Sequence, residues 1–148
     1  MPPGALRFPA IGLRAAEERS VMADTGDNRR SGNVGEALAC GEYLRRGYSV
    51  LERNMRVPGF GEADIVLEDT AEKLLVFCEV KLRRSSRFGS PGEAVNQKKQ
   101  MTIRRLAECY LASHPEYDGY NVRFDVAEIL ADEKRTGRNR INMIEDAF

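Results

Sequence analysis

Two apolar runs, separated by a short polar segment, constrain the fold of this chain more than any other feature. The first run is Ile65–Leu67, the second is Leu74–Cys78, and residues 68–73 lie between them. Apolar runs of this length on either side of a polar turn predict a β-hairpin. Because the runs contain almost only Ile, Val, Leu and Phe, we expect both faces of the hairpin to be buried.

Three charged residues interrupt or border these runs: Asp64, Glu79 and Lys81. A buried charge is costly unless it is paired or binds a metal ion. The charges are therefore the informative part of the hairpin, because the apolar pattern around them predicts burial.

The register of the hairpin decides whether the two acids meet. We place the turn near residues 70 and 71, and in the antiparallel pairing that follows, Glu62 faces Glu79. Asp64 then faces Phe77 and becomes a diagonal neighbour of Glu79 on the same face, with Cα atoms roughly 7–8 Å apart.

Neighbouring carboxylates repel each other, and a divalent cation between them removes the repulsion. Mg²⁺ accepts one or two protein carboxylates and completes its shell with water and phosphate oxygens. Lys81 follows Glu79 by two residues, so its amine reaches the same face. Two carboxylates, a metal ion and an amine suit hydrolysis of a phosphodiester bond. The residues alone leave a second interpretation open, in which Glu79 and Lys81 form an ordinary ion pair at a sheet edge.

Length and composition exclude several classes of protein. A chain of 148 residues suits one domain, and no apolar run approaches the roughly 20 residues of a membrane span. The N-terminus lacks the apolar segment of a signal peptide. The cysteines Cys40, Cys78 and Cys109 form no C-x-x-C pair, so we expect reduced thiols and a cytoplasmic location. The single histidine, His114, precludes a multi-histidine zinc site, and we expect it to end a helix.

The net charge is zero, but the charges are unevenly distributed. Residues 81–105 hold eight basic side chains and one acidic one, whereas residues 108–133 hold seven acidic side chains and one arginine. A basic segment next to an acidic metal site suits the phosphate backbone of a nucleic acid. On charge alone, a solvated basic helix face explains the segment equally well.

The chain divides into two parts by composition. Residues 1–31 are polar and turn-rich toward their end, and we expect a flexible N-terminal extension followed by one domain over residues 32–148. Met22 is an alternative start of translation that the sequence alone does not decide.

Two helices are expected within the domain. The first spans Val34–Arg46, with Asn33 as its cap. Glu36 then either closes a capping box or points from the first turn toward the carboxylates. Ser-Pro-Gly-Glu at residues 90–93 predicts the start of the second helix, which continues to residue 113 and directs Lys98 toward the site.

Further strands complete the expected sheet. They span Tyr48–Val57, Asn121–Leu130 and Ile141–Ile144, and Asp125 is expected to pair with a nearby arginine. The order α-β-β-β-α-β predicts an α/β domain whose mixed central sheet is flanked by helices.

This element order and the pattern Asp64…Glu79-Val80-Lys81 resemble the restriction-endonuclease-like fold and its PD-(D/E)xK nuclease motif. Over about residues 32–148 the sequence resembles, more closely, the YraN-like family of bacterial proteins, which is grouped with Holliday-junction-resolvase-like nucleases. The matching positions are Gly35-Glu36, Arg53-Asn54, Gly61–Asp64, Phe77–Lys81, Arg87–Gly89, Lys98 and Arg123–Asp125.

The resemblance implies roles for several of the matching charged residues. Asp64 and Glu79 would hold Mg²⁺ or Mn²⁺, Lys81 would be the catalytic lysine, and Glu36 would add an acid from the first helix. The accessory positions are Glu62 and Lys98, and the side chains expected to contact nucleic acid are Arg83, Arg84, Arg87 and Lys99.

We therefore expect a metal-dependent endonuclease-like protein that acts on DNA, with branched or structured DNA and a homodimer as open options. The alternative is a non-catalytic nucleic-acid-binding or protein-interaction module that retains the fold. A third interpretation is a purely structural cluster, in which the Glu79→Ala substitution lowers stability and changes nothing else.

Overall fold

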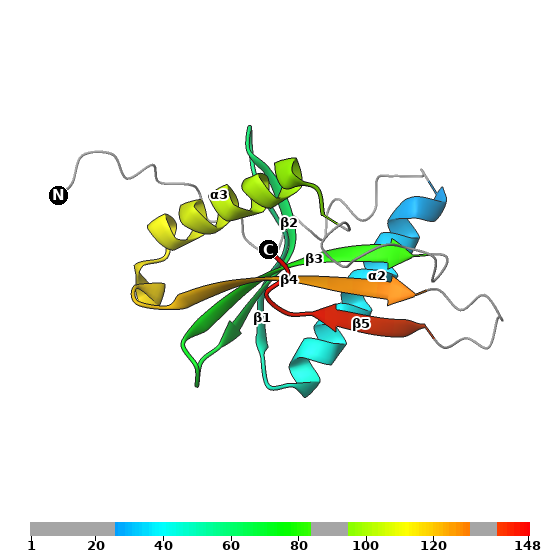
Figure 1. The fold of residues 1–148 in the computed structure, drawn as a ribbon, viewed down its shortest axis with the longest axis horizontal. Coiled ribbons are helices and arrows are strands. Elements are labelled where there is room, and N and C mark those ends of the chain that lie inside the picture. Colours follow the sequence, from blue (N-terminus) through cyan, green and yellow to red (C-terminus); the bar gives the residue numbers. More distant parts are fainter. Residues whose placement is uncertain (1–25, 84–94, 131–138) are drawn as a thin grey trace.

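The computed structural model describes residues 26–83, 95–130 and 139–148, with side chains from residue 32 onward. This part of the chain is an α/β domain with a five-stranded sheet in the order β1-β2-β3-β4-β5 (Figure 1). Strands β3 and β4 are parallel, and the other neighbours are antiparallel. The elements are α2 (Gly26–Arg45), β1 (Ser49–Val57), β2 (Gly61–Asp69), β3 (Leu74–Arg83), α3 (Gln97–Ser113), the short 3₁₀ helix η2 (Pro115–Tyr117), β4 (Asn121–Leu130) and β5 (Arg140–Ile144).

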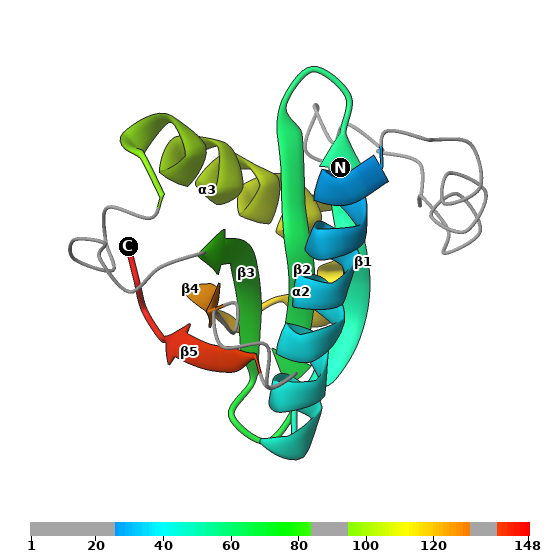
Figure 2. The same cartoon turned by 90° about the vertical axis from the view of Figure 1, so that its right-hand side faces the viewer.

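The two long helices cover opposite faces of the sheet, so the domain has three layers (Figure 2). Ile65 and Leu67 of β2 pack with α2, whereas Val66 of the same strand packs with α3. None of these three side chains is accessible to solvent. The expectation that both faces of the hairpin are buried is confirmed.

Each helix presents one apolar stripe to the sheet. In α3, Ile103, Leu106 and Tyr110 recur at helical spacing and are buried. In α2, Ala39 and Tyr43 pack against the opposite face. Among the described residues, no helix is both long enough and apolar enough to cross a membrane.

The strands match the sequence-based expectation closely, and the mixed α/β architecture is confirmed. The hairpin register is shifted by two residues, because Phe77 pairs with Val66 and not with Asp64. The cause is the turn: Lys73 adopts a positive φ of 48°, and the Asp69 carboxylate accepts hydrogen bonds from the backbone N–H groups of Ala71 and Glu72. This turn occupies residues 70–73 and centres one residue later than expected.

Both helix starts differ from the expectation. Helix α2 begins at Gly26, so Asn33 lies inside it and Glu36 is not in its first turn. Six residues assigned to the N-terminal extension, 26–31, are therefore helical. Helix α3 begins at Gln97 with Asn96 as its cap, and residues 90–93, where a start was expected, lie outside the described residues.

A buried carboxylate ties α2 to the sheet. Asp125 on β4 is inaccessible to solvent and accepts two hydrogen bonds from Arg123 at 2.8 Å, which confirms the expected arginine pair. The hydroxyl of Tyr43 on α2 donates to the same carboxylate at 2.8 Å, and the backbone N–H of Asp146 donates at 3.0 Å. His114 caps the C-terminal end of α3, as expected.

Candidate functional site

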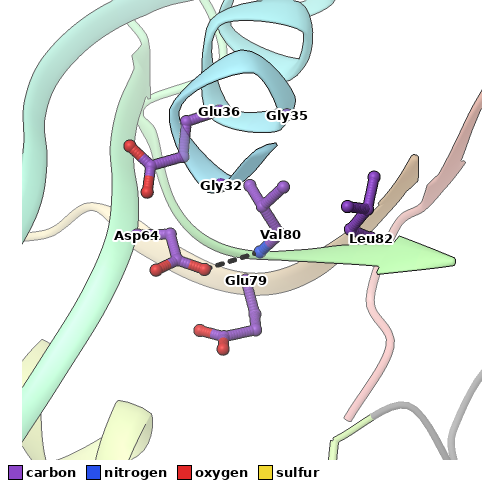
Figure 3. Close-up of a pocket in the computed structure, with 7 residues that line it drawn as sticks. All are labelled: Gly32, Gly35, Glu36, Asp64, Glu79, Val80 and Leu82. Atoms are coloured by element: carbon purple, nitrogen blue, oxygen red, sulfur yellow. Dashed lines mark hydrogen bonds between the residues drawn. The ribbon is translucent and has the colours of Figure 1, made fainter. Parts of the chain in front are cut away.

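The site lies where β2 and β3 separate. Their ladder ends at the pair Ile65–Cys78, and beyond it β2 stays paired with β1 while β3 stays paired with β4. In this register Asp64 and Glu79 follow directly after the last pair. Asp64 extends its carboxylate across the opening and accepts a hydrogen bond from the backbone N–H of Val80 at 2.8 Å (Figure 3). The aspartate therefore takes the place of a ladder partner and has a fixed orientation.

Glu79 is a buried acid of the site whose pKa lies well above its ordinary value. Its side chain is only 6% exposed, and ammonium groups lie 3.6 Å from each oxygen: Lys81 Nζ from Oε1 and Lys99 Nζ from Oε2. Among the described residues, none donates a hydrogen bond to Oε2. Burial, and secondly the charge of Asp64, raise the pKa of Glu79 to about 7, although the two lysines act in the opposite direction.

Glu36 adds a third carboxylate from α2. Its Oε2 accepts hydrogen bonds from Asn54 at 3.0 Å and from Arg53 at 3.2 Å, both on β1. Burial and the charge of Asp64 raise the pKa of Glu36, and the hydrogen bonds from Asn54 and Arg53 lower it. The two donors on one oxygen orient Glu36 from the neighbouring strand.

The preceding residue, Gly35, lets α2 approach the sheet closely. A Cβ atom at this position would lie 3.3 Å from Val80 Cγ1. The three carboxylates consequently line one cavity of about 190 Å³, in which Asp64 lies between the other two acids (Figure 3). The lining residues are Gly32, Gly35, Glu36, Asp64, Glu79, Val80 and Leu82.

The donor set suits one kind of metal ion and not another. Within the described ranges, no three His, Cys, Asp or Glu side chains form an all-protein metal cage. Mg²⁺ does not require such a cage, because it binds through one or two carboxylates and fills its remaining positions with water and substrate phosphates. The carboxylates of Asp64 and Glu79 fit this requirement, and they suit Mn²⁺ equally, because Mn²⁺ also prefers oxygen ligands.

The other expected site residues have different positions. Lys99, assigned to nucleic-acid contact, reaches Glu79 and donates to the Glu62 carbonyl at 2.9 Å. Lys98, expected at the site, is exposed, and the helix lysine that pairs with Glu79 is its neighbour Lys99. The Glu62 carboxylate pairs with Arg56. Arg83 lies 3.7 Å from Glu128, and the remaining two expected basic contacts, Arg84 and Arg87, lie outside the described residues.

Arg53 and Asn54 are the site residues to which sequence reasoning gave no role. Asn54 adopts a left-handed conformation, with φ 52°, in the middle of β1. Asn is uncommon inside strands and tolerates this conformation better than most residues. An Asn within an otherwise extended segment was therefore a usable signal.

Fold and site together define an α/β domain with a carboxylate–lysine cluster at the point where two central strands diverge. Residues 35–129 match the family described as "Uncharacterised protein family UPF0102". The chain belongs to this family, which confirms its resemblance to the YraN-like proteins.

Two relatives illustrate the similarity. The UPF0102 protein of Caldicellulosiruptor bescii is 43% identical over 120 residues, which cover 81% of this chain and 98% of the relative. The UPF0102 protein of Alkaliphilus oremlandii is 46% identical over 124 residues, which cover 82% of this chain and 99% of the relative. The similarity thus spans nearly the whole of each relative.

Proposed function

We propose that this chain is a metal-dependent endonuclease that hydrolyses phosphodiester bonds in DNA, including branched or structured DNA. The observation that carries the proposal is the convergence of the Glu36, Asp64 and Glu79 carboxylates in one cavity. An ammonium group, Lys81 Nζ, lies 3.6 Å from Glu79 Oε1. Burying several acids close together is costly, and a divalent cation bound between Asp64 and Glu79 would offset part of that cost.

Each residue has a separate task in the proposed reaction. Asp64 is oriented by the Val80 N–H, and Glu79, whose Oε2 receives no hydrogen bond from the described residues, supplies a second carboxylate. A bound Mg²⁺ would offset the charge of both carboxylates and of the scissile phosphate and would favour deprotonation of the attacking water. Glu36, held by Asn54, lines the same cavity and is placed to orient that water.

The two lysines differ in freedom. The Lys81 side chain is 37% exposed, and within the described part of the chain its ion pair is with Glu79 alone. Its ammonium can therefore move to the phosphate and stabilise charge that develops there. Lys99 is held by the Glu62 carbonyl as well as by Glu79. We assign the phosphate contact to Lys81 and the neutralisation of Glu79 to Lys99.

The electrostatic setting also favours an anionic substrate. The first turn of α3 contains Lys98 and Lys99 and no acidic residue, although a helix N-terminus normally favours acids. A phosphate backbone is a suitable partner for such a turn.

The direct test is cleavage of linear, nicked, flapped and four-way DNA with Mg²⁺ or Mn²⁺. Wild-type protein should cleave at least one form, and Asp64→Asn and Lys81→Met should each lower the rate by about 100-fold. Asp118→Asn, at an exposed position outside the cavity, is the matched control and should cleave like wild type.

Two results would count against the proposal. One is the absence of cleavage of every DNA form with either metal. The other is an Asp64→Asn variant as active as wild type. DNA binding without cleavage, unchanged by metal, would instead support a non-catalytic module.

A further inference from the structure

The tip of the β1–β2 hairpin presents an exposed aromatic side chain. Phe60 is 46% exposed and is absent from both core clusters of the described residues. The backbone N–H of Phe60 donates to the Val57 carbonyl at 3.0 Å. Pro58 and Gly59 lie between them, and Gly59 has a φ of +81°, which matches a type II turn with proline at its second and glycine at its third position.

The tip is braced against α3. Gly61 has a φ of +135°, and a Cβ atom there would lie only 2.6 Å from Thr102 Cγ2. Only glycine permits both this conformation and this approach. The hairpin therefore packs onto α3 just before its tip projects beyond the rest of the sheet, as both ribbon views show (Figure 1, Figure 2).

The tip lies within reach of a nucleic acid at the candidate site. Phe60 precedes Asp64 by four residues, and β2 begins at Gly61. At the rise of an extended strand this separation is about 13 Å. DNA rises 3.4 Å per base along a strand, so Phe60 lies roughly four base steps from a phosphate at Asp64.

An exposed cation beside the hairpin, Lys98, favours nucleic acid over a second protein as the occupant, because Lys98 lies one turn before Thr102, whose side chain approaches Gly61 next to the tip. Arg53 and Arg56 on β1 and Lys98 on α3 are all exposed. Arg56 pairs with Glu62 at the base of the tip, and Arg53 pairs with Glu36. An exposed aromatic ring with a cation on the neighbouring element is a usual combination for binding single-stranded or distorted nucleic acid, since bases stack on the ring while the cation attracts the backbone.

We infer that Phe60 stacks on a nucleobase of DNA held at the Asp64–Glu79 cavity and that this contact selects DNA with unpaired or weakly stacked bases. The inference rests on the proposed function for its placement of the DNA. Inserting a side chain into an intact duplex requires unstacking of a base step. At a junction, flap or mismatch the bases are already unstacked, so binding requires no unstacking energy. The stacking on Phe60 then makes the affinity for these forms higher than the affinity for intact duplex.

The test measures binding without divalent metal, so that it does not depend on cleavage. Four-way, flapped and linear duplex DNA carry the fluorescent base 2-aminopurine, at the branch point or in the middle of the duplex. Wild-type protein should quench the branched probes on binding. Phe60→Ala should abolish the quenching and weaken binding to branched DNA by about tenfold, while binding to linear duplex changes by less than about twofold.

Three further variants make the result specific. Phe60→Trp should restore quenching and affinity, whereas Phe60→Leu, which keeps an apolar side chain, should not. Leu44→Ala removes a side chain that is 57% exposed on α2 and should change nothing. Thermal melting establishes that every variant is folded.

The outcomes separate this inference from the proposed function. Equal binding and equal quenching by wild type and Phe60→Ala would overturn the stacking contact, even if the protein cleaves DNA. An equal loss of affinity for all DNA forms, or a change of oligomeric state in Phe60→Ala, would overturn it as well. Quenching that depends on Phe60, in a protein that cleaves no DNA, would support the stacking contact and contradict the proposed nuclease activity.

Discussion

Asn54 shows how a single residue of β1 is adapted to the site. It lies between Arg53 and Met55, which pair with Ile65 and Ala63, so it stands across from Asp64. Its left-handed conformation interrupts the extended strand, and its amide donates to Glu36. Such conformations inside strands are concentrated at functional sites, where surrounding structure maintains them.

The amide and the backbone of Asn54 can be tested separately. Asn54→Gly retains the left-handed conformation and removes the amide, whereas Asn54→Ala removes both. We expect both variants to lose about 1–2 kcal/mol in the free energy of unfolding, because a hydrogen bond to a buried carboxylate is lost, with the larger loss in Asn54→Ala. Urea unfolding measures this difference, and wild-type stability in Asn54→Gly would show that the amide contributes nothing.

Glu79 makes stability depend on pH in a direction opposite to that of most carboxylates. Its pKa of about 7 in the folded protein exceeds the ordinary value of 4.5, so the folded state binds the proton more tightly than the unfolded chain. The stabilising contribution of protonated Glu79 is therefore complete below pH 4.5 and is lost as the pH rises through 7.

Glu79→Gln, which resembles the protonated acid, should consequently stabilise the metal-free protein at pH 8.5. The expected gain in the free energy of unfolding is up to about 3 kcal/mol, and it should fall below about 1 kcal/mol at pH 5, close to the ordinary pKa of 4.5. Denaturant unfolding at the two pH values measures it. A variant less stable than wild type at pH 8.5 would mean that Lys81 and Lys99 outweigh the burial of the charge.

The site residues that could be predicted from sequence are the charged residues that interrupt the apolar strand pattern. Asp64, Glu79 and Lys81 stood out because charges in apolar runs need partners, and the structure brings them together. We expected Lys98 to face the site, whereas Lys99 is the lysine that reaches Glu79. Neighbouring helix positions differ by about 100° in direction, so the sequence does not distinguish the two. Only the packing of α3 on β2 fixes which of the two lysines faces Glu79.

At the scale of elements, the placement of α2 decides where Glu36 lies. Two contacts set this placement: Gly35 touches the sheet near the site, and Tyr43, two turns later, donates to the buried Asp125. Arg123 completes the charge balance of Asp125. The helix is thus attached by close packing near its middle and by a buried hydrogen bond near its C-terminal end.

Substitutions of Tyr43 and Asp125 should show that losing one hydrogen bond lowers the free energy of unfolding less than leaving a charge unpaired does. Tyr43→Phe should lower the free energy of unfolding by about 1–2 kcal/mol. Asp125→Ala should lower it by about 3–5 kcal/mol, because it leaves Arg123 without its partner. Urea unfolding followed by circular dichroism measures both, and equal effects of the two variants would contradict this assignment.

The strands were predictable from sequence because each has a short apolar run between turn signals, and β4 has the bounds expected. The helix starts were not, since capping patterns occur by chance: Asn33 and Glu36 form one inside α2. The observed hairpin register differs from the expected one because Lys73, in a left-handed conformation, lengthens the turn. Lys rarely adopts that conformation, so the sequence contains no signal for it.

At the scale of the whole molecule, the site is a consequence of sheet topology. Strand β2 follows β1 and strand β3 follows β4 past the pair Ile65–Cys78, so an opening forms in the middle of the sheet. The helices on the two faces contribute Glu36 from one side and Lys99 from the other. The opening brings backbone groups and three acids to one cavity, while the core clusters on the two faces of the sheet stay packed.

The central claim is that these acids form a binding site for one divalent cation. Calorimetric titration of Mn²⁺ into wild type, Asp64→Asn and the control Asp118→Asn at pH 7.5 tests it most directly. We predict one site per chain in wild type and in Asp118→Asn, with affinity at least about tenfold lower in Asp64→Asn. Absence of binding to wild type, or equal binding to Asp64→Asn, would contradict the account.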